Sequence, residues 1–376
     1  MKLHRTPVRP ARRTSTRLGA VAAGLALPLV LAACGGGEGG GVALAADAAL
    51  PEKVPSGTVL RVGDPATQVV LEQAGLDKEL EQAGVEVEWA NITGGPKSLE
   101  AFRADALDVS SVADIPPLFA HWTDTEVKIV AARETVDPLD HPVYQLGIAP
   151  GAGVRSLDDL KGKKIAYSPG QAQGALVLRV LQEAGLTQDD VELVEMQSVD
   201  DTFANALGSK QIDVAPLGQS QVGAYLEKYA GDGAAAIKPG VRDDAWTLYA
   251  PVETVEDADK AAALREYVEV WAKAQLWIND HPDEFAQLYY VDHEGLPLPE
   301  AKKVVAALGK NEVPTDWTGF IERHQETADL LSEEQGQPEV DVEDLYDRRY
   351  EKAIAQALAD TGAGAKPGPA ASKGAA

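Results

Sequence analysis

Two stretches of this sequence match in detail, Leu71-Glu72-Gln73-Ala74-Gly75-Leu76 and Leu181-Gln182-Glu183-Ala184-Gly185-Leu186. Each is followed by a member of a second matching pair, Leu107-Asp108-Val109-Ser110-Ser111-Val112-Ala113-Asp114 and Ile212-Asp213-Val214-Ala215-Pro216-Leu217-Gly218-Gln219. Each half therefore runs helix, Gly-Leu break, strand, helix, strand, and ends on a polar residue before a helix. Short α/β segments of unrelated origin also resemble one another, which is the alternative. We interpret the matches as one chain folded into two similar lobes.

Short apolar runs alternate with helical patterns on both sides of these matches. In the first half, strands are expected at 59–62, 85–90, 107–111 and 127–132, with helices at 68–82, 97–103 and 116–122. In the second half, strands are expected at 164–167, 191–196 and 212–216, with helices at 171–184, 199–207 and 219–229. This order indicates βαβ units and a mainly parallel sheet in each lobe, an α/β fold. A long helix at 258–279 is expected to pack back on the first lobe.

The N-terminus has the pattern of an export signal, with a basic segment followed by an uncharged apolar run at 18–31. The run ends in Leu31-Ala32-Ala33-Cys34, which resembles the lipobox of bacterial lipoproteins. The resemblance implies a signal peptide at 1–33, cleavage before Cys34 and acylation of its sulfur. A membrane-spanning helix needs about 20 apolar residues, more than this run has. The pair Arg12-Arg13 lacks the apolar continuation of a twin-arginine signal, and a plain secretory signal would not require the cysteine.

Composition separates two flexible ends from a folded body. Residues 34–57 are rich in Gly and Ala without an aromatic residue and are expected to form a tether, and 359–376 a disordered tail. Loss of residues 1–33 removes six basic and no acidic residues, so the formal charge falls from −25 to −31. Such a charge disfavours nucleic acid as a partner. The histidines show no ligand spacing, so neither a metal site nor a cofactor is expected.

The ligand is expected to bind to the first residues of helices that begin along a cleft between the two lobes. Open α/β sheets bind ligands at the carboxyl ends of their strands, where helix starts direct free N–H groups at an anion. Helix capping alone explains any single start equally well. The candidate starts are Thr67-Gln68, Gly94-Gly95-Pro96-Lys97, Asp114-Ile115-Pro116, Gly170-Gln171-Ala172-Gln173 and Gln219-Ser220.

Several of these motifs together resemble a known family. Thr93-Gly94-Gly95-Pro96-Lys97-Ser98-Leu99-Glu100-Ala101-Phe102, Ala113-Asp114-Ile115-Pro116-Pro117 and Leu157-Asp158-Asp159-Leu160-Lys161-Gly162 are similar to motifs of the ABC transporter substrate-binding proteins for aliphatic sulfonates, taurine and nitrate. The resemblance implies a two-lobed periplasmic-binding-protein-like (type II) fold with a cleft between the lobes. It places lobe one at 58–147 and 247–358 and lobe two at 148–246, with crossings near 143–149 and 245–251.

Carried over position by position, the resemblance implies eight ligand-binding residues. Lobe one contributes Gln68, Gly95 and Asp114. Lobe two contributes Gln171, Ala172, Gln173 and Gln219, with Tyr249 beside the second crossing. Two departures from the family pattern stand out, because Ala113 replaces a common glycine and amide side chains replace Ser or Thr at the second-lobe helix start. No arginine is among the candidates, and Asp114 is equally compatible with a structural role and with direct contact.

The resemblance implies capture of a small organic anion, an aliphatic sulfonate or a taurine-like molecule, by lobe closure. Nitrate and a pyrimidine precursor of thiamine remain open as ligands. The implied protein is a monomer, anchored by lipid on the outer side of the cell membrane, and its partners are an ABC permease and ATPase. The enzyme alternative is a desulfinase of the same fold that attacks with a cysteine. Cys34, the sole cysteine, precedes the fold, so we expect no catalysis.

Overall fold

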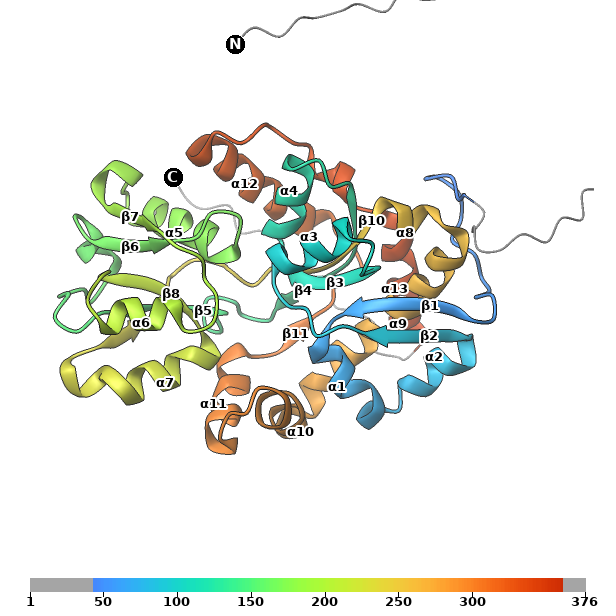
Figure 1. Ribbon diagram of the computed structural model, residues 1–376, viewed down its shortest axis with the longest axis horizontal. Helices are drawn as coiled ribbons and strands as arrows, with labels where there is room; N and C mark the ends of the chain where they lie inside the picture. The colour runs from blue at the N-terminus through green and yellow to red at the C-terminus, as the bar shows by residue number, and fades with distance from the viewer. Residues whose placement is uncertain (1–42, 361–376) are drawn as a thin grey trace, which may run out of the picture. The chain divides into compact units, whose positions relative to one another are not determined.

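The computed structural model describes residues 43–360 (Figure 1), which contain a six-stranded and a five-stranded β-sheet. The first sheet has the order β11-β4-β10-β3-β1-β2 and the second β7-β6-β8-β5-β9. The strands of the first sheet are β1 (Thr58–Gly63), β2 (Val85–Trp89), β3 (Val109–Ala113), β4 (Val127–Thr135), β10 (Trp246–Pro251) and β11 (Asn311–Glu312). Those of the second are β5 (Tyr144–Ile148), β6 (Lys164–Tyr167), β7 (Glu192–Glu195), β8 (Val214–Gly218) and β9 (Ala235–Ile237).

Helices connect most of these strands and cover the sheets. The first half contains α1 (Pro65–Ala74), α2 (Asp77–Ala83), α3 (Gly95–Arg103) and α4 (Ile115–Trp122). The second contains η1 (Leu157–Leu160), α5 (Ala172–Glu183), η2 (Gln188–Asp190), α6 (Thr202–Gly208), α7 (Gln219–Tyr229) and η3 (Ala230–Asp232). The C-terminal part contains α8 (Val252–Glu256), α9 (Ala258–Asp280), α10 (Pro282–Phe285), η4 (Ala286–His293), α11 (Leu298–Leu308), α12 (Thr318–Gln335), η5 (Val342–Leu345) and α13 (Arg348–Asp360).

Apart from β11, the two sheets have the same topology. In the first, β1 pairs in parallel with β2 and β3, and β10 lies antiparallel between β3 and β4. In the second, β6 pairs in parallel with β7 and β8, and β5 lies antiparallel between β8 and β9. Each antiparallel strand enters its sheet directly after the chain has left the other sheet. The predicted α/β fold with two similar lobes is therefore confirmed.

The matched Leu-to-Leu stretches form the same helix end in both lobes. The N–H of Leu76 donates to the carbonyl of Leu71 at 2.9 Å, and that of Leu186 to the carbonyl of Leu181 at 2.8 Å. Gly75 and Gly185, with φ of 70° and 66°, supply the left-handed residue that this cap requires. The shared sequence thus ends the first α-helix of each lobe and turns the chain into the next element, α2 in lobe one and η2 in lobe two.

The second matched pair also performs one task in both lobes. Asp108 precedes β3 and accepts the backbone N–H of Arg61 at 2.7 Å, and Asp213 precedes β8 and accepts that of Lys164 at 2.9 Å. In each case an aspartate fixes the start of one parallel strand against its neighbour. Asp108 forms more bonds than Asp213, because it also pairs with the Arg61 guanidinium at 2.7 Å and the Lys260 ammonium at 2.8 Å.

The connections between the sheets differ from those expected. The segments expected as crossings at 143–149 and 245–251 contain β5 and β10, which pair within the second and first sheets, respectively. The chain passes between the sheets just before each strand, at 136–143 and 238–245. The sequence prediction missed this because a crossing segment and a short apolar strand have the same extended pattern.

Part of the expected tether at 34–57 belongs to the folded body. Ala43 forms a β-bridge with Asp257, and the guanidinium of Arg265 donates to the carbonyl of Pro51 at 3.2 Å. Residues 43–57 therefore lie against the folded body, because their backbone groups find partners on α9 and near α8. Cys34, the signal peptide at 1–33 and the tail from 361 onward lie outside the described residues.

The long helix α9 packs on the first sheet, as expected from its apolar pattern. It contacts β1 and α1 and carries Trp271, which is 1 % exposed. Trp277 instead stacks on the imidazole of His281, where the helix ends. Along residues 43–360, no helix has both the length and the apolar character needed to cross a membrane.

Candidate functional site

Five helices begin at the carboxyl ends of parallel strands, within two residues of the expected starts. The first sheet leads from β1 into α1, from β2 into α3 and from β3 into α4. The second leads from β6 into α5 and from β8 into α7 (Figure 1). The first turn of each helix has backbone N–H groups without partners inside the helix, so these edges attract hydrogen-bond acceptors.

Two of the predicted residues of lobe one have different environments. Gln68 is exposed on the first turn of α1. Gly95 is buried at the start of α3, where a Cβ atom would lie only 2.5 Å from the Cγ of Pro116. Glycine is therefore needed at this position so that α3 and α4 can begin side by side. Gly95 thus allows close packing between α3 and α4, and Gln68 is accessible to a ligand.

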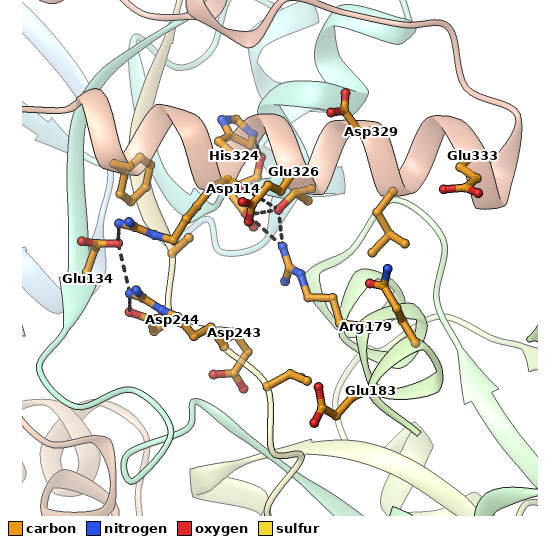
Figure 2. Close-up of a pocket in the computed structure, with 18 residues that line it drawn as sticks. Asp114, Glu134, Arg179, Glu183, Asp243, Asp244, His324, Glu326, Asp329 and Glu333 are labelled. Atoms are coloured by element: carbon orange, nitrogen blue, oxygen red, sulfur yellow. Dashed lines mark hydrogen bonds and ion pairs between the residues drawn. The ribbon is translucent and has the colours of Figure 1, made fainter. Parts of the chain in front are cut away.

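Asp114 connects elements of the two sheets. Its side chain is 6 % exposed, and its carboxylate lies 3.5 Å from the guanidinium of Arg179 on α5. The hydroxyl of Thr327 on α12 donates to the same carboxylate at 3.3 Å (Figure 2). Its backbone carbonyl accepts a hydrogen bond from the imidazole of His324 at 2.9 Å. In this conformation Asp114 therefore has protein partners from both lobes.

His324 is expected to make the stability of the protein depend on pH near neutrality. The ring is 1 % exposed, and burial lowers its pKa below 6.5. Its Nε2 donates to Asp114 and its Nδ1 accepts from the hydroxyl of Tyr346 at 2.8 Å, so the neutral form is fully bonded. As the pH falls through 6.5, the unfolded chain binds a proton that the folded chain does not, and stability decreases.

The gap in Tm between the wild type and a His324→Gln variant is expected to narrow as the pH falls from 7.5 to 5.5, because only the wild type loses the contribution of the neutral imidazole. The variant should also lose about 1–3 kcal/mol at pH 7.5, because one buried hydrogen bond is lost or strained. A gap in Tm that stays constant between pH 7.5 and pH 5.5 would show that His324 does not contribute to the pH dependence of stability.

The predicted residues of lobe two form the start of α5. The Oε1 atom of Gln171 accepts from the Ser168 hydroxyl and from the N–H of Ser198, the latter at 3.0 Å. Ala172 and Gln173 follow on the first turn and are partly exposed. Gln171 thus holds the loop at 198 against the helix start, and Ala172 and Gln173 present their backbone N–H groups beside it.

Gln219 and Tyr249 are both buried. The amide of Gln219 donates to the carbonyl of Pro142 at 2.7 Å and accepts from Gln145 at 3.0 Å, so it ties α7 to the first connection. Tyr249 is 0 % exposed in the centre of β10, and its ring meets that of Phe102 edge to face at 4.8 Å between centroids. The structure brings Tyr249 into the core and does not bring it together with the helix starts of lobe two.

A cavity of about 610 Å³ lies between α5, α12 and the second connection (Figure 2). Its wall contains eight carboxylates and three guanidinium groups, those of Arg179, Arg242 and Arg323. Asp114 is the predicted residue that lines it. Glu134 is within 3.1 Å of Arg242 and also pairs with Arg323, but most of the other carboxylates have no cationic partner in the cavity. The surplus of negative charge makes this cavity unfavourable for a free anion.

Two adjacent carboxylates fix the second connection to both lobes. Asp243 accepts the N–H groups of Val143 and Tyr144 at 3.0 and 2.8 Å, at the entrance to the second sheet. Asp244 accepts the N–H of Thr135 at 2.9 Å, at the end of β4 in the first. Burial raises the pKa of Asp243 to about 7, although the two N–H bonds act in the opposite direction. The two connections are thus bonded to each other.

Arg133 is a residue that the sequence analysis missed. It lies near the carboxyl edge of the first sheet, on β4, directly opposite Trp246 of β10. The Cζ atom of Arg133 is 5.3 Å from the centre of the Trp246 ring, and the indole N–H donates to the Ser111 hydroxyl at 2.6 Å. The available signal was weak, a single charged residue directly after the apolar strand expected at 127–132. In the described part of the chain, no group of three or more His, Cys, Asp or Glu side chains is arranged to hold a metal ion.

Two matched α/β sheets, two connections and polar helix starts along the carboxyl edges define the class of proteins with the periplasmic-binding-protein fold. The chain belongs to the NMT1/THI5-like family, whose model matches residues 80–285. This result confirms the class of protein inferred from the sequence motifs.

Three known proteins illustrate the similarity. A putative aliphatic sulfonates-binding protein of Bacillus subtilis (strain 168) is 26 % identical over 292 residues, which cover 76 % of this chain and 83 % of that protein. The alkanesulfonate-binding protein SsuA from Xanthomonas axonopodis pv. citri, bound to MOPS, has a TM-score of 0.63 at 21 % identity, over 80 % of this chain and 99 % of that one. The desulfurization enzyme DszB has a TM-score of 0.55 at 16 % identity, over 81 % and 99 %. The two structures share the fold, and the relatives named as binding proteins support a solute-binding role.

Proposed function

We propose that this protein is the extracytoplasmic solute-binding component of an ABC importer and that it captures a small organic anion of the aliphatic sulfonate type. The observation that carries the proposal is the pair of matched sheets, each ending in helix starts that offer unpaired N–H groups. Sulfonate oxygens are acceptors that such groups can bind. The names of the B. subtilis and Xanthomonas proteins support the same ligand class.

Lobe closure is the proposed means of capture. The two lobes are joined at 136–143 and 238–245, and residues on both connections are bonded to each other. A ligand that touches helix starts of both lobes favours the conformation in which the lobes approach, because only that conformation allows both sets of contacts. The Asp114–Arg179 pair is a protein contact that forms between elements of the two lobes.

Lipid attachment at Cys34 and partnership with an ABC permease and ATPase complete the proposal. Both rest on the N-terminal sequence motif and on the similarity to binding proteins. Nitrate and a pyrimidine precursor of thiamine are the alternative ligands. A desulfinase-like activity has one specific point in favour, the DszB fold similarity, and one against, because the sole cysteine precedes the folded body.

Scanning calorimetry tests the ligand class directly. The purified chain from residue 43 onward is heated alone and with short alkanesulfonates, taurine, nitrate, sulfate or a thiamine pyrimidine precursor. A ligand at 100 times its Kd adds about 2.7 kcal/mol to the free energy of unfolding, which raises Tm by several degrees. We expect this increase with an alkanesulfonate. The anion proposal fails if none of the anions raises Tm, and product formation from a sulfinate would favour the enzyme instead.

A further inference from the structure

We propose that Arg133 binds the anionic group of the ligand and that Trp246 contacts its carbon chain. This inference rests on the proposed function and specifies the ligand class as organic monoanions that have an apolar part. It adds a cation to a site for which the sequence offered no arginine or lysine side chain among its eight candidates.

The Arg133 guanidinium has unused hydrogen-bond donors. Its Nη1 donates to the Oδ1 atom of Asn311, and its Nε is removed from solvent without an acceptor among residues 43–360. No carboxylate in this part of the chain lies within ion-pair distance of it. An arginine carries five N–H donors, so most of its bonding capacity remains available.

A partly buried charge without an ion-pair partner gains little from its surroundings. Desolvation lowers the pKa of Arg133, with the negative charges of Asp64 and Asp244 acting in the opposite direction from a distance. An anion that arrives with the ligand would provide the missing acceptor and the missing countercharge.

The position of Arg133 in the first sheet also suits ligand binding. Arg133, Trp246 and Ser111 are each partly exposed, and they lie near the carboxyl edge of β3 and β4, the edge where α4 begins. The Trp246 ring, 5.3 Å from the Arg133 Cζ atom, is held by its bond to Ser111. A charged group and a fixed aromatic surface side by side suit a molecule with an anionic head and an aliphatic chain.

Asn311 is the positioning residue of this cluster. Its backbone N–H donates to the Asn279 side chain at 2.7 Å, and its amide nitrogen donates to Gln275 on α9 at 3.3 Å. These bonds direct its Oδ1 atom at Arg133. The guanidinium is therefore oriented before a ligand arrives, which lowers the entropic cost of binding.

The test compares Arg133→Gln and Arg133→Lys with the wild type by titration calorimetry. The probes are a short alkanesulfonate and the neutral sulfonamide of the same chain. We expect Arg133→Gln to bind the sulfonate about 10- to 100-fold more weakly, because charge-assisted hydrogen bonds are lost, and to bind the sulfonamide almost unchanged. Arg133→Lys should recover part of the affinity, since it keeps the charge but not the planar fork. Arg103→Gln is the matched control, because among residues 43–360 the Arg103 side chain donates to Thr123 and Thr125, at the far end of α3.

The outcomes separate the two proposals. If the wild type binds no anion, the proposed function fails, and this inference fails with it. If the wild type binds the sulfonate and folded Arg133→Gln binds it equally well, only the role of Arg133 is overturned. If the Gln variant does not fold, the Lys variant decides, with weaker sulfonate binding supporting the role and unchanged binding contradicting it.

Discussion

Replacing Asp108 with alanine is expected to lower the free energy of unfolding by about 3 kcal/mol, since a buried carboxylate that bonds two cations and a backbone N–H is removed. The side chain of Asp108 is 4 % exposed, whereas those of Arg61 and Lys260 are about a quarter exposed and can turn to water. The chain contains its own comparison, because Asp213 occupies the matching position of the second lobe and bonds one N–H. Asp213→Ala should therefore cost about 1 kcal/mol.

Asp108 should also determine part of the dependence of the unfolding free energy on pH in the acidic range. Burial acts to raise the pKa of Asp108, but the bonds from Arg61 and Lys260 outweigh it and hold the pKa below 3.8. The stabilisation is present above the pKa of the unfolded chain and is lost as the pH falls through the folded value. Urea unfolding from pH 7 to pH 2.5 should show the gap between wild type and Asp108→Ala closing below pH 3.8. A constant gap, or equal effects of the two alanine variants, would contradict this account.

Replacing Gly174 with alanine is the change expected to damage the helix start of lobe two. A Cβ atom at this position would overlap the carbonyl oxygen of Ser168 and lie 2.8 Å from its carbonyl carbon. Backbone atoms cannot move aside as the end of a flexible side chain can, so α5 must shift away from the turn that follows β6. We expect a loss of about 1–3 kcal/mol in unfolding free energy.

Gly174→Ala should also lower the ligand affinity, because Gln171, Ala172 and Gln173 move with the first turn of α5. Gly231→Ala is the matched control, since a Cβ atom there meets no atom within 4 Å and the backbone is not in the left-handed region. Urea unfolding and calorimetry with the same sulfonate measure the two effects. Wild-type stability and affinity in Gly174→Ala would show that the α5 start tolerates displacement and does not contact the ligand.

Much of the fold followed from local signals in the sequence. The Gly-Leu breaks, the helix starts on Gly, Pro or polar residues, and the apolar strands all act within a few residues, and the structure has the elements close to the expected bounds. Strand β3 was expected at 107–111 and is found at Val109–Ala113, because Asp108 binds across to Arg61 before the strand begins. Such a shift depends on a partner 47 residues away.

The candidate site was less accessible to sequence reasoning for the same reason. Tyr249 was expected near a crossing, but its core position follows from the pairing of β10 with β3 and β4, which no local pattern reveals. In the sequence, Arg133 is an ordinary charged residue at the end of a strand. Its neighbours Trp246 and Asn311 lie beside it only because β10 and β11 pair with β4. Helix starts can be predicted locally, whereas side chains that meet across a sheet cannot.

The central position of β10 determines the order in which the lobes become complete as the chain is made. Strand β4 has β10 and β11 as its neighbours in the sheet, so its pairing groups have no strand partner until residues 246–251 have been synthesised. The second sheet, by contrast, is contained entirely within Tyr144–Ile237. During synthesis from the N-terminus, the second lobe therefore has all its strands before the first lobe does. The lobe that begins the sequence is the last to close its sheet.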